Sequence, residues 1–280
     1  MTLEVTLLVL LAALLHAGWN ALVKAGEDRL LAITMVIGVA AVGAALALPF
    51  LAPPAPASWI YLILSVVLHA AYFFLLSGAY RVGDLSHVYP VARGTAPLLV
   101  AIGAALFAGE HLGSIAMGGL LLAALAIASF ALDGHRRGAD RRPLIFALAI
   151  ACFISTYTVV DGLGVRAAGD ALGYIAWLFA LHGLPLFLYV LIWRRRDLAP
   201  YLQAHWKTGL LGGGLCAGAY GLVIWALGQG AMAYVSALRE TSVIFAVWIG
   251  TRLLGEPFGR RRLLAAAAVA AGIAVMKSAE

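Results

Sequence analysis

Two arginines and two acidic residues stand inside stretches that are otherwise apolar, and these four side chains are the strongest candidates for chemistry. Arg93 lies in one such stretch, Arg239 and Glu240 are neighbours in a second, and Asp161 lies in a third. A guanidinium group binds carboxylate, phosphonate or zwitterionic groups through paired, charge-assisted hydrogen bonds. A carboxylate in an apolar environment can accept a proton or pair with a cation. The pattern therefore indicates an anion-binding site with acidic groups beside it.

Each of the four charges also has a structural interpretation. Arg93 or Arg239 could pair with backbone carbonyls or with Asp161 instead of with a substrate. Glu240 directly follows Arg239, and neighbours on a helix point about 100° apart, so we expect no facing pair between them. Glu240 is then expected to pair with a group on a second helix or to bind a proton. Asp161 stands near the end of its stretch, where a water partner is the alternative.

Polar residues at helical spacing form three further stripes. His16, Trp19 and Asn20 share one helical face, His69 shares a face with Tyr72, and Tyr157 shares one with Asp161. Such stripes should turn away from lipid, either toward a substrate or into hydrogen bonds between helices. His182 stands by itself and is interpreted as a satisfied structural histidine. The candidate substrate-binding residues are His16, Trp19, Asn20, His69, Tyr72, Tyr89, Arg93, Tyr157 and Arg239, and the proton-coupling candidates are Asp161 and Glu240.

The elements that must position these residues are membrane-spanning helices. Apolar residues make up 64% of the chain, charged residues 11%, and the mean hydropathy is +0.98. A soluble domain has about 25% charged residues, and a spanning helix needs roughly 20 apolar ones. The sequence predicts an all-α integral membrane protein with ten spans, at 4–24, 30–51, 58–80, 86–108, 113–132, 143–165, 171–193, 206–228, 231–254 and 260–277.

The basic residues predict the orientation of these spans. Fifteen Lys and Arg residues fall in the loops after the odd-numbered spans: Lys24, Arg29, Arg81, Arg136, Arg137, Arg141, Arg142, Arg194, Arg195, Arg196, Lys207, Arg252, Arg260, Arg261 and Arg262. The opposite side holds Arg166 and Lys277. Cytoplasmic loops are enriched in Lys and Arg, so both termini are predicted outside the cytoplasm. The net charge of +6 then reports topology and contact with anionic lipid.

Several residues predict where helices bend, begin or pack. Pro90 and Pro97 flank Arg93, which favours a flexible or broken fourth span, and Pro185 favours a bend in the seventh. Glu110 and Glu256 are predicted at the starts of the fifth and tenth spans, where an acid stabilises free backbone donors. The two cysteines, Cys152 and Cys216, are expected to be apolar core residues without a disulfide.

The two halves of the chain match each other. A shift of 146 positions places Arg93 and Thr95 on Arg239 and Thr241, and it places Gly109-Glu110 on Gly255-Glu256. Each half contains five spans, an odd number, so the halves enter the membrane from opposite sides. This is an inverted-topology repeat, the architecture of secondary transporters with a site near the midplane. The predicted repeats are 1–132 and 143–280.

These features give a family resemblance. Ten spans in two five-helix repeats, each with Gly-Glu after its fourth helix, resemble the drug/metabolite transporter superfamily and its EamA-type members. His16-Ala-Gly-Trp-Asn20 and Tyr89-Pro-Val-Ala-Arg-Gly-Thr95 resemble a subgroup associated with phosphonate use. The resemblance implies a bacterial inner-membrane permease, usually an exporter of amino acids or related metabolites, with the fifth and tenth helices at the periphery. Many members are drawn with cytoplasmic termini, whereas the charges here predict periplasmic ones.

Other function classes have little support. The sequence contains no His-Glu-x-x-His, phosphate-binding glycine loop or Gly-x-Ser-x-Gly motif. We expect no cofactor, no metal and no nucleic-acid partner, because the basic residues belong to membrane loops. The expected partners are a small-molecule substrate and membrane lipid. Formation of a homodimer is a further alternative. An intramembrane enzyme acting on lipid and a passive channel are the alternatives.

Overall fold

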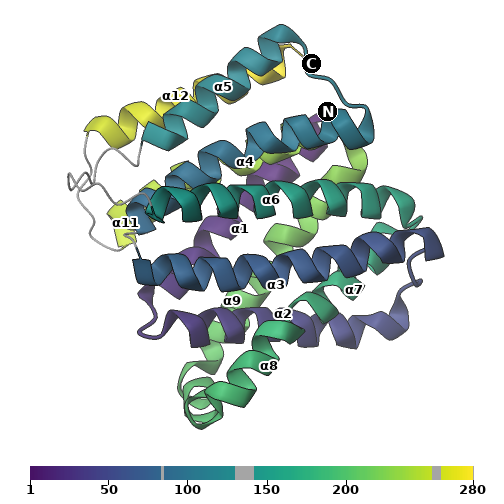
Figure 1. Ribbon diagram of the computed structural model, residues 1–280, viewed down its shortest axis with the longest axis vertical. Helices are drawn as coiled ribbons and strands as arrows, with labels where there is room; N and C mark the ends of the chain where they lie inside the picture. The colour runs from purple at the N-terminus through teal and green to yellow at the C-terminus, as the bar shows by residue number, and fades with distance from the viewer. Residues whose placement is uncertain (83–84, 130–141, 254–259, 280) are drawn as a thin grey trace.

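The chain is α-helical in the residues that the computed structural model describes, 1–82, 85–129, 142–253 and 260–279 (Figure 1). Within these ranges there is no β-strand. The helices are α1 (Leu3–Ala25), α2 (Arg29–Ala47), α3 (Trp59–Val82), α4 (Leu85–Ala108), α5 (Ser114–Ser129), α6 (Arg142–Ala167), α7 (Ala171–His182), α8 (Leu184–Trp193), α9 (Arg195–Gln229), α10 (Met232–Arg239), α11 (Ser242–Leu253) and α12 (Arg260–Ser278). Short 3₁₀ turns lie at Leu48–Phe50 and Pro56–Ser58.

Every predicted span has a helical counterpart. Seven helical segments are long and apolar enough to cross a membrane, and α5 and the end of α12 are shorter apolar helices. Large apolar side chains such as Phe50, Leu106 and Trp193 are more than two-thirds exposed on the outside of the bundle. In a soluble protein such a surface would aggregate, whereas in lipid it is solvated. The chain is therefore an all-α, multi-pass membrane protein.

Side-chain caps fix the ends of several helices in the loops. Thr2 accepts a hydrogen bond from the backbone N–H of Val5 at the start of α1, and Asp28 accepts one from Leu31 at the start of α2. Asp170 does the same for Gly173 in α7, at 2.9 Å. Each cap satisfies a backbone donor that the helix leaves without a partner.

Two predicted spans are discontinuous. The seventh span consists of α7 and α8, which meet at Gly183, and Pro185 stands in the first turn of α8, as the sequence predicted. The ninth consists of α10 and α11, separated by Glu240 and Thr241. At this second break, i→i−3 backbone bonds such as Thr241 N–H to Leu238 C=O keep the chain compact.

The predicted break in the fourth span is wrong, because α4 runs without interruption through Pro90 and Pro97. Packing explains why this helix holds together. Gly94 lies so close to α5 that an added Cβ would be 2.6 Å from the carbonyl oxygen of Ala124. Helices packed this closely in a membrane tolerate a proline without breaking.

The contacts between helices repeat when the first and the second half of the chain are exchanged. Each of three contacts has a counterpart made by the matching helices. The contact of α1 with α9 corresponds to that of α6 with α3, and the contact of α2 with α9 to that of α7 with α3. The contact of α4 with α6 corresponds to the contacts of α10 and α11 with α1. In this correspondence α1, α2, α3 and α4 of the first half match α6, α7, α9 and the pair α10–α11 of the second half. The pairs α2·α7 and α5·α12 map onto themselves. Most helices of one half thus pack mainly on helices of the other half.

The helices α5 and α12 lie side by side at one edge of the bundle (Figure 1). Their backbones approach most closely at Gly119 and Gly272, where an added Cβ would be 2.5–2.6 Å from the carbonyl oxygen of the other glycine. Small residues at such a crossing allow close backbone packing between membrane helices. The two helices therefore join the halves away from the polar residues of the centre.

Both chain termini lie at the same end of the helices (Figure 1). Lys277, in the last turn of α12, donates a hydrogen bond to the hydroxyl of Thr6 in α1. Two termini at the same end fit an even number of spans. The hydrogen bond from Lys277 to Thr6 connects the end of the second half to the start of the first.

Candidate functional site

An ion-paired triad is buried inside the helix bundle. Nε of Arg93 on α4 lies 2.7 Å from Oε2 of Glu240, and Nη2 of Arg93 donates a 3.0 Å hydrogen bond to the hydroxyl of Ser242. Nε of Arg239 lies 3.6 Å from Oε1 of Glu240. The three side chains are 4%, 3% and 1% exposed for Arg93, Arg239 and Glu240. The two arginines, which the sequence places in different halves, therefore converge on one carboxylate.

The break in the ninth span makes this geometry. α10 ends at Arg239, and Glu240 is the residue after its last turn. The expectation that Arg239 and Glu240 would not face one another is therefore wrong, because it assumed a continuous helix. The turn at 240–241 brings the side chains of two sequence neighbours together. It also places Ser242, the first residue of α11, within reach of Arg93.

The triad carries a net charge of +1 and contains donors without acceptors. Nε and Nη2 of Arg239 are buried and have no hydrogen-bond partner in the described structure, since 3.6 Å is too long for a hydrogen bond. The buried hydroxyl of Ser236, one turn earlier on α10, has no hydrogen-bond partner there either. Buried donors are normally satisfied, so Arg239 and Ser236 are suited to receive an acceptor from another molecule.

The stripe on α1 lies beside this triad. His16 is within electrostatic range of both Arg93 and Arg239. Its ring makes an edge-on contact with Trp19 at 5.3 Å between centroids. The side-chain amide of Asn20 donates a 2.8 Å hydrogen bond to the backbone carbonyl of His16. One N–H of the Asn20 amide is thus used within its own helix, and the other N–H and the amide oxygen can make other contacts.

A second cluster surrounds Asp161 on α6, which is 0% exposed. Its carboxylate accepts hydrogen bonds from the hydroxyls of Tyr174 at 3.1 Å and Tyr220 at 2.5 Å. The Ser65 side chain on α3 is a further hydrogen-bond partner. Within the described part of the chain, no Lys or Arg nitrogen lies within ion-pair distance of this carboxylate. Asp161 is therefore held by hydroxyl groups alone.

Aromatic rings line the region next to Asp161. His69 stacks on Tyr157 with 4.1 Å between ring centroids, and its Nδ1 interacts with the backbone carbonyl and hydroxyl of Ser65. Tyr72 meets Tyr157 edge-on at 5.8 Å. His182 lies 5.4 Å from His69, so this histidine, interpreted as structural from the sequence, joins the cluster while its Nδ1 contacts the Leu178 carbonyl.

Sequence reasoning did not find Ser65, Tyr174, Tyr220, Ser236 and Ser242. Single Ser and Tyr residues are common in membrane helices, and their pairing with Asp161 or Arg93 depends on tertiary packing. One candidate cannot be placed: Tyr89 belongs to α4, but its side chain lies outside the described residues, as does Glu256. Both cysteines are free, with Cys152 exposed and Cys216 buried. Among the described residues, no group of three His, Cys, Asp or Glu could hold a metal ion.

Separate ion-pair networks lie at the two ends of the helices. At the end that holds the termini, Glu110 pairs with Arg166 at 2.6 Å and accepts a 2.7 Å hydrogen bond from the backbone N–H of Met232. Arg166 also donates to the carbonyls of Leu227 and Gly230. Glu110 lies in the loop directly before α5, and the helix start whose backbone donor it satisfies is that of α10 in the other half.

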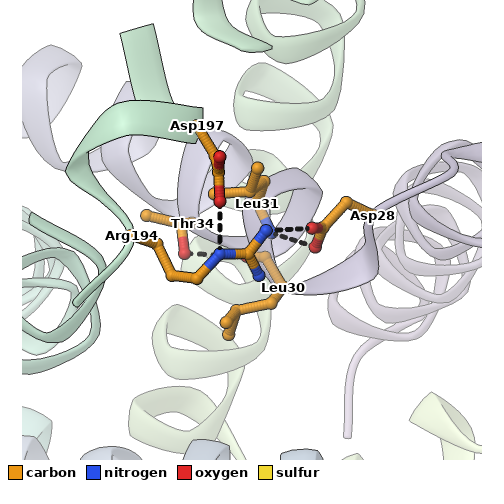
Figure 2. A network of polar contacts seen from close by, with 6 residues as sticks. All are labelled: Asp28, Leu30, Leu31, Thr34, Arg194 and Asp197. Carbon is orange, nitrogen blue, oxygen red and sulfur yellow. Dashed lines mark hydrogen bonds and ion pairs between the residues drawn. The ribbon is translucent and has the colours of Figure 1, made fainter.

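At the opposite end, Arg194 connects the loop before α2 to the junction of α8 and α9. Figure 2 shows its guanidinium between Asp28, at 2.8 Å, and Asp197, at 2.6 Å. Asp28 is also the N-cap of α2. The hydrogen bonds that Arg194 donates to the carboxylates of Asp197 and Asp28 raise its pKa, so it stays charged. The network connects the start of α2 to the junction of α8 and α9.

The chain was compared with known proteins. Residues 141–278 match the profile described as the EamA-like transporter family. A solved crystal structure superposes with a TM-score of 0.72 over 98% of this chain and 96% of that one, at 17% sequence identity, and so shares the fold. A search of curated proteins gave no match.

Proposed function

The chain belongs to the EamA-like transporter family of the drug/metabolite transporter superfamily, and on that premise we propose that it carries small polar metabolites with an anionic group. Amino acids, related zwitterions and small phosphonates or carboxylates have this chemistry. The substrate is held near the midplane between the two halves, which open in turn to each side of the membrane. Transport is secondary and uses no ATP.

The observation that carries this proposal is the buried triad with Arg239. A cation inside a membrane is costly unless it is paired, and here one carboxylate is shared by two guanidinium groups. The remaining charge and the Nε and Nη2 donors of Arg239 suit a substrate carboxylate or phosphonate. Trp19 and His16 supply an apolar wall and a polar group beside it, the usual composition of a small-molecule site.

The proposal includes a location and an orientation. We place the protein in a bacterial inner membrane with both termini on the periplasmic side. The basic residues support this, because they gather in the loops at the end opposite the termini. Export is the direction that the family resemblance favours.

Binding to the purified protein tests the substrate class. Thermal unfolding is measured with L-alanine, succinate and methylphosphonate, and with putrescine as a cation without an anionic group. A ligand of the folded state raises the unfolding temperature. We expect at least one of the three anionic or zwitterionic probes to stabilise the protein and putrescine to have no effect. Stabilisation by putrescine alone contradicts the proposal.

Variants and flux complete the test. Arg239→Gln should weaken binding of the stabilising probe about ten- to a hundredfold, because it removes a charge-assisted contact. Arg196→Gln removes an exposed arginine and serves as the control. In liposomes, saturable counterflow of the unmodified probe supports a transporter. Conversion of lipid without flux supports an enzyme, and non-saturable flux supports a channel.

A further inference from the structure

Glu240 and Asp161, the two buried acids of the centre, have opposite environments. Glu240 lies between two guanidinium groups, at 2.7 and 3.6 Å. Among the described residues, the hydrogen-bond partners of Asp161 are hydroxyl groups. A carboxylate between two cations keeps its charge, whereas one without a cation is the acid that can lose its charge at the lowest cost. The surroundings therefore distinguish the two residues, which sequence alone left as equal candidates.

The groups around Asp161 come from every helix packed on α6. They are Ser65 and His69 of α3, Tyr157 of α6 itself, Tyr174 and His182 of α7, Tyr220 of α9 and Arg239 of α10. Arg93 of α4 interacts electrostatically with Tyr157 in the same region. Of these, Arg239 is the cation that acts on Asp161, and it does so through space. The Asp161 cluster and the triad therefore share one electrostatic environment.

Charge balance connects the two clusters. With both acids ionised, Arg93, Arg239, Glu240 and Asp161 sum to zero. A substrate anion at Arg239 makes the sum −1 and cancels the positive charge that stabilises ionised Asp161. Uncompensated charge is costly in a medium of low dielectric constant. One proton on Asp161 restores neutrality, so binding of the anion and binding of the proton favour each other.

We propose that Asp161 is the protonation site that couples transport to protons, and that it takes up one proton when an anionic substrate group occupies Arg239. This rests on the substrate class of the proposed function and not on its direction, because a proton that moves together with the anion drives it inward, opposite to the export that the family resemblance favours. The proton adds to Oδ1, whose bond from Tyr174 is the longer of the two. The Tyr174 hydroxyl turns to accept it, while Tyr220 continues to donate to Oδ2. The proton comes from a hydronium ion, whose O–H bond breaks to leave water, and the Oδ1–H bond is the one covalent bond that forms.

Proton uptake during binding tests the proposal directly. The full-length protein in lipid nanodiscs is mixed with whichever of succinate or methylphosphonate stabilises it, in weak buffer with a pH indicator. L-alanine is left out because its net charge is zero and does not change the charge balance. We expect uptake of about one proton per bound probe, and a Kd that weakens about tenfold per pH unit on the alkaline side. Asp161→Asn should bind the probe without proton uptake and without this pH dependence. Glu4→Gln, an exposed acid in α1, is the control.

A second measurement needs no substrate. The infrared band of a protonated carboxyl, identified as the band missing in Asp161→Asn, is compared between the wild type and Arg239→Gln. Loss of the Arg239 charge imitates the bound anion, so this band should be stronger in Arg239→Gln at the same pH. Should Asp161→Asn fail to fold, Asp161→Glu keeps an acid and should keep the proton uptake.

Three results overturn the proposal. The first is probe binding without proton uptake in the wild type, which leaves the proposed substrate class intact. The second is uptake that persists in Asp161→Asn. The third is an infrared band that Arg239→Gln does not change. Failure of all three probes to bind counts against the proposed function, and the infrared comparison then decides the role of Asp161 by itself.

Discussion

At the residue scale, the central finding is that the two buried arginines have different partners. Arg93 lies 2.7 Å from Glu240 and its Nη2 donates to Ser242, whereas Arg239 is 3.6 Å from Glu240 and its Nη2 has no hydrogen-bond partner in the described structure. The sequence treated them as an equivalent pair at matching positions of two repeats. The contacts indicate that Arg93 mainly supports the fold and Arg239 mainly supports binding.

We therefore expect the two arginine variants to differ. Arg93→Gln leaves Glu240 buried without its close partner, and loss of one member of a buried pair costs about 3–5 kcal/mol of unfolding free energy. Arg239→Gln leaves the closer pair in place, so it should keep most of the folded protein and lose binding. Thermal unfolding and probe affinity of both variants are the measurements. Equal loss of stability in the two variants would contradict this division.

The residues that the sequence predicted are those for which burial is expensive. A charged side chain inside a membrane is energetically costly and is usually functional or paired. This is why the sequence alone singles out Arg93, Arg239, Glu240 and Asp161. Tyr174 and Tyr220 were not predicted as partners of Asp161, because a tyrosine hydroxyl is compatible with lipid interfaces, solvent or a buried acceptor. Only the crossing of α6 with α7 and α9 decides between these environments.

At the element scale, hydropathy predicted where spans begin and end but not where they break. Pro90 and Pro97 suggested a break in α4, yet tight packing at Gly94 keeps this helix continuous. The break in the ninth span contains no proline. It lies at Glu240 and Thr241, where Glu240 reaches the arginine of another helix. A hydropathy average over about twenty residues cannot detect a two-residue turn that ion pairing stabilises.

The crossing of α5 and α12 predicts that alanine is destabilising at Gly119, and the neighbouring Gly118 serves as the control position. An added Cβ at Gly119 would be 2.5 Å from the carbonyl oxygen of Gly272, whereas one at Gly118 meets no atom within 4 Å. Gly119→Ala should lower the unfolding free energy by about 1–3 kcal/mol through overpacking. Gly118→Ala should be neutral or slightly stabilising, since alanine favours helix. Equal thermal stability of the two variants in detergent would show that the crossing is looser than described.

At the scale of the whole molecule, the centre lies between two ion-pair networks that join different loops. Glu110 and Arg166 connect the halves at the end that holds the termini, and Asp28, Arg194 and Asp197 connect loops at the other end. Both networks are formed in this structure. If the halves open in turn to each side, each network must break in one of the two open states.

Breaking the network near the termini should bias the molecule toward opening at that end. A cysteine is introduced at the buried Ser236 and labelled with a thiol reagent that does not cross membranes. We expect Arg166→Gln to increase labelling from the side of the termini, and Arg194→Gln to leave labelling from that side unchanged or lower. Unchanged labelling in Arg166→Gln would mean that this ion pair does not restrain opening.

The orientation of the molecule has a direct test. A reporter enzyme that is active only outside the cytoplasm, fused after Glu280, should be active, because the basic loops lie at the opposite end. The same reporter inserted after Arg137 should be inactive. The reverse pattern would invert the proposed topology and leave the helix packing unaffected.

The packing of each half on the other has a consequence for synthesis. The ribosome completes α4 long before Ser242 and Glu240 exist, since Arg93 and Ser242 are 149 positions apart. At about 5–20 residues per second, the wait is on the order of ten to thirty seconds. During that time the Arg93 guanidinium lacks Glu240 and Ser242. The translocon, lipid headgroups or a membrane chaperone must accommodate this charge, and a nascent chain arrested before Glu240 should be a preferred target of membrane proteases.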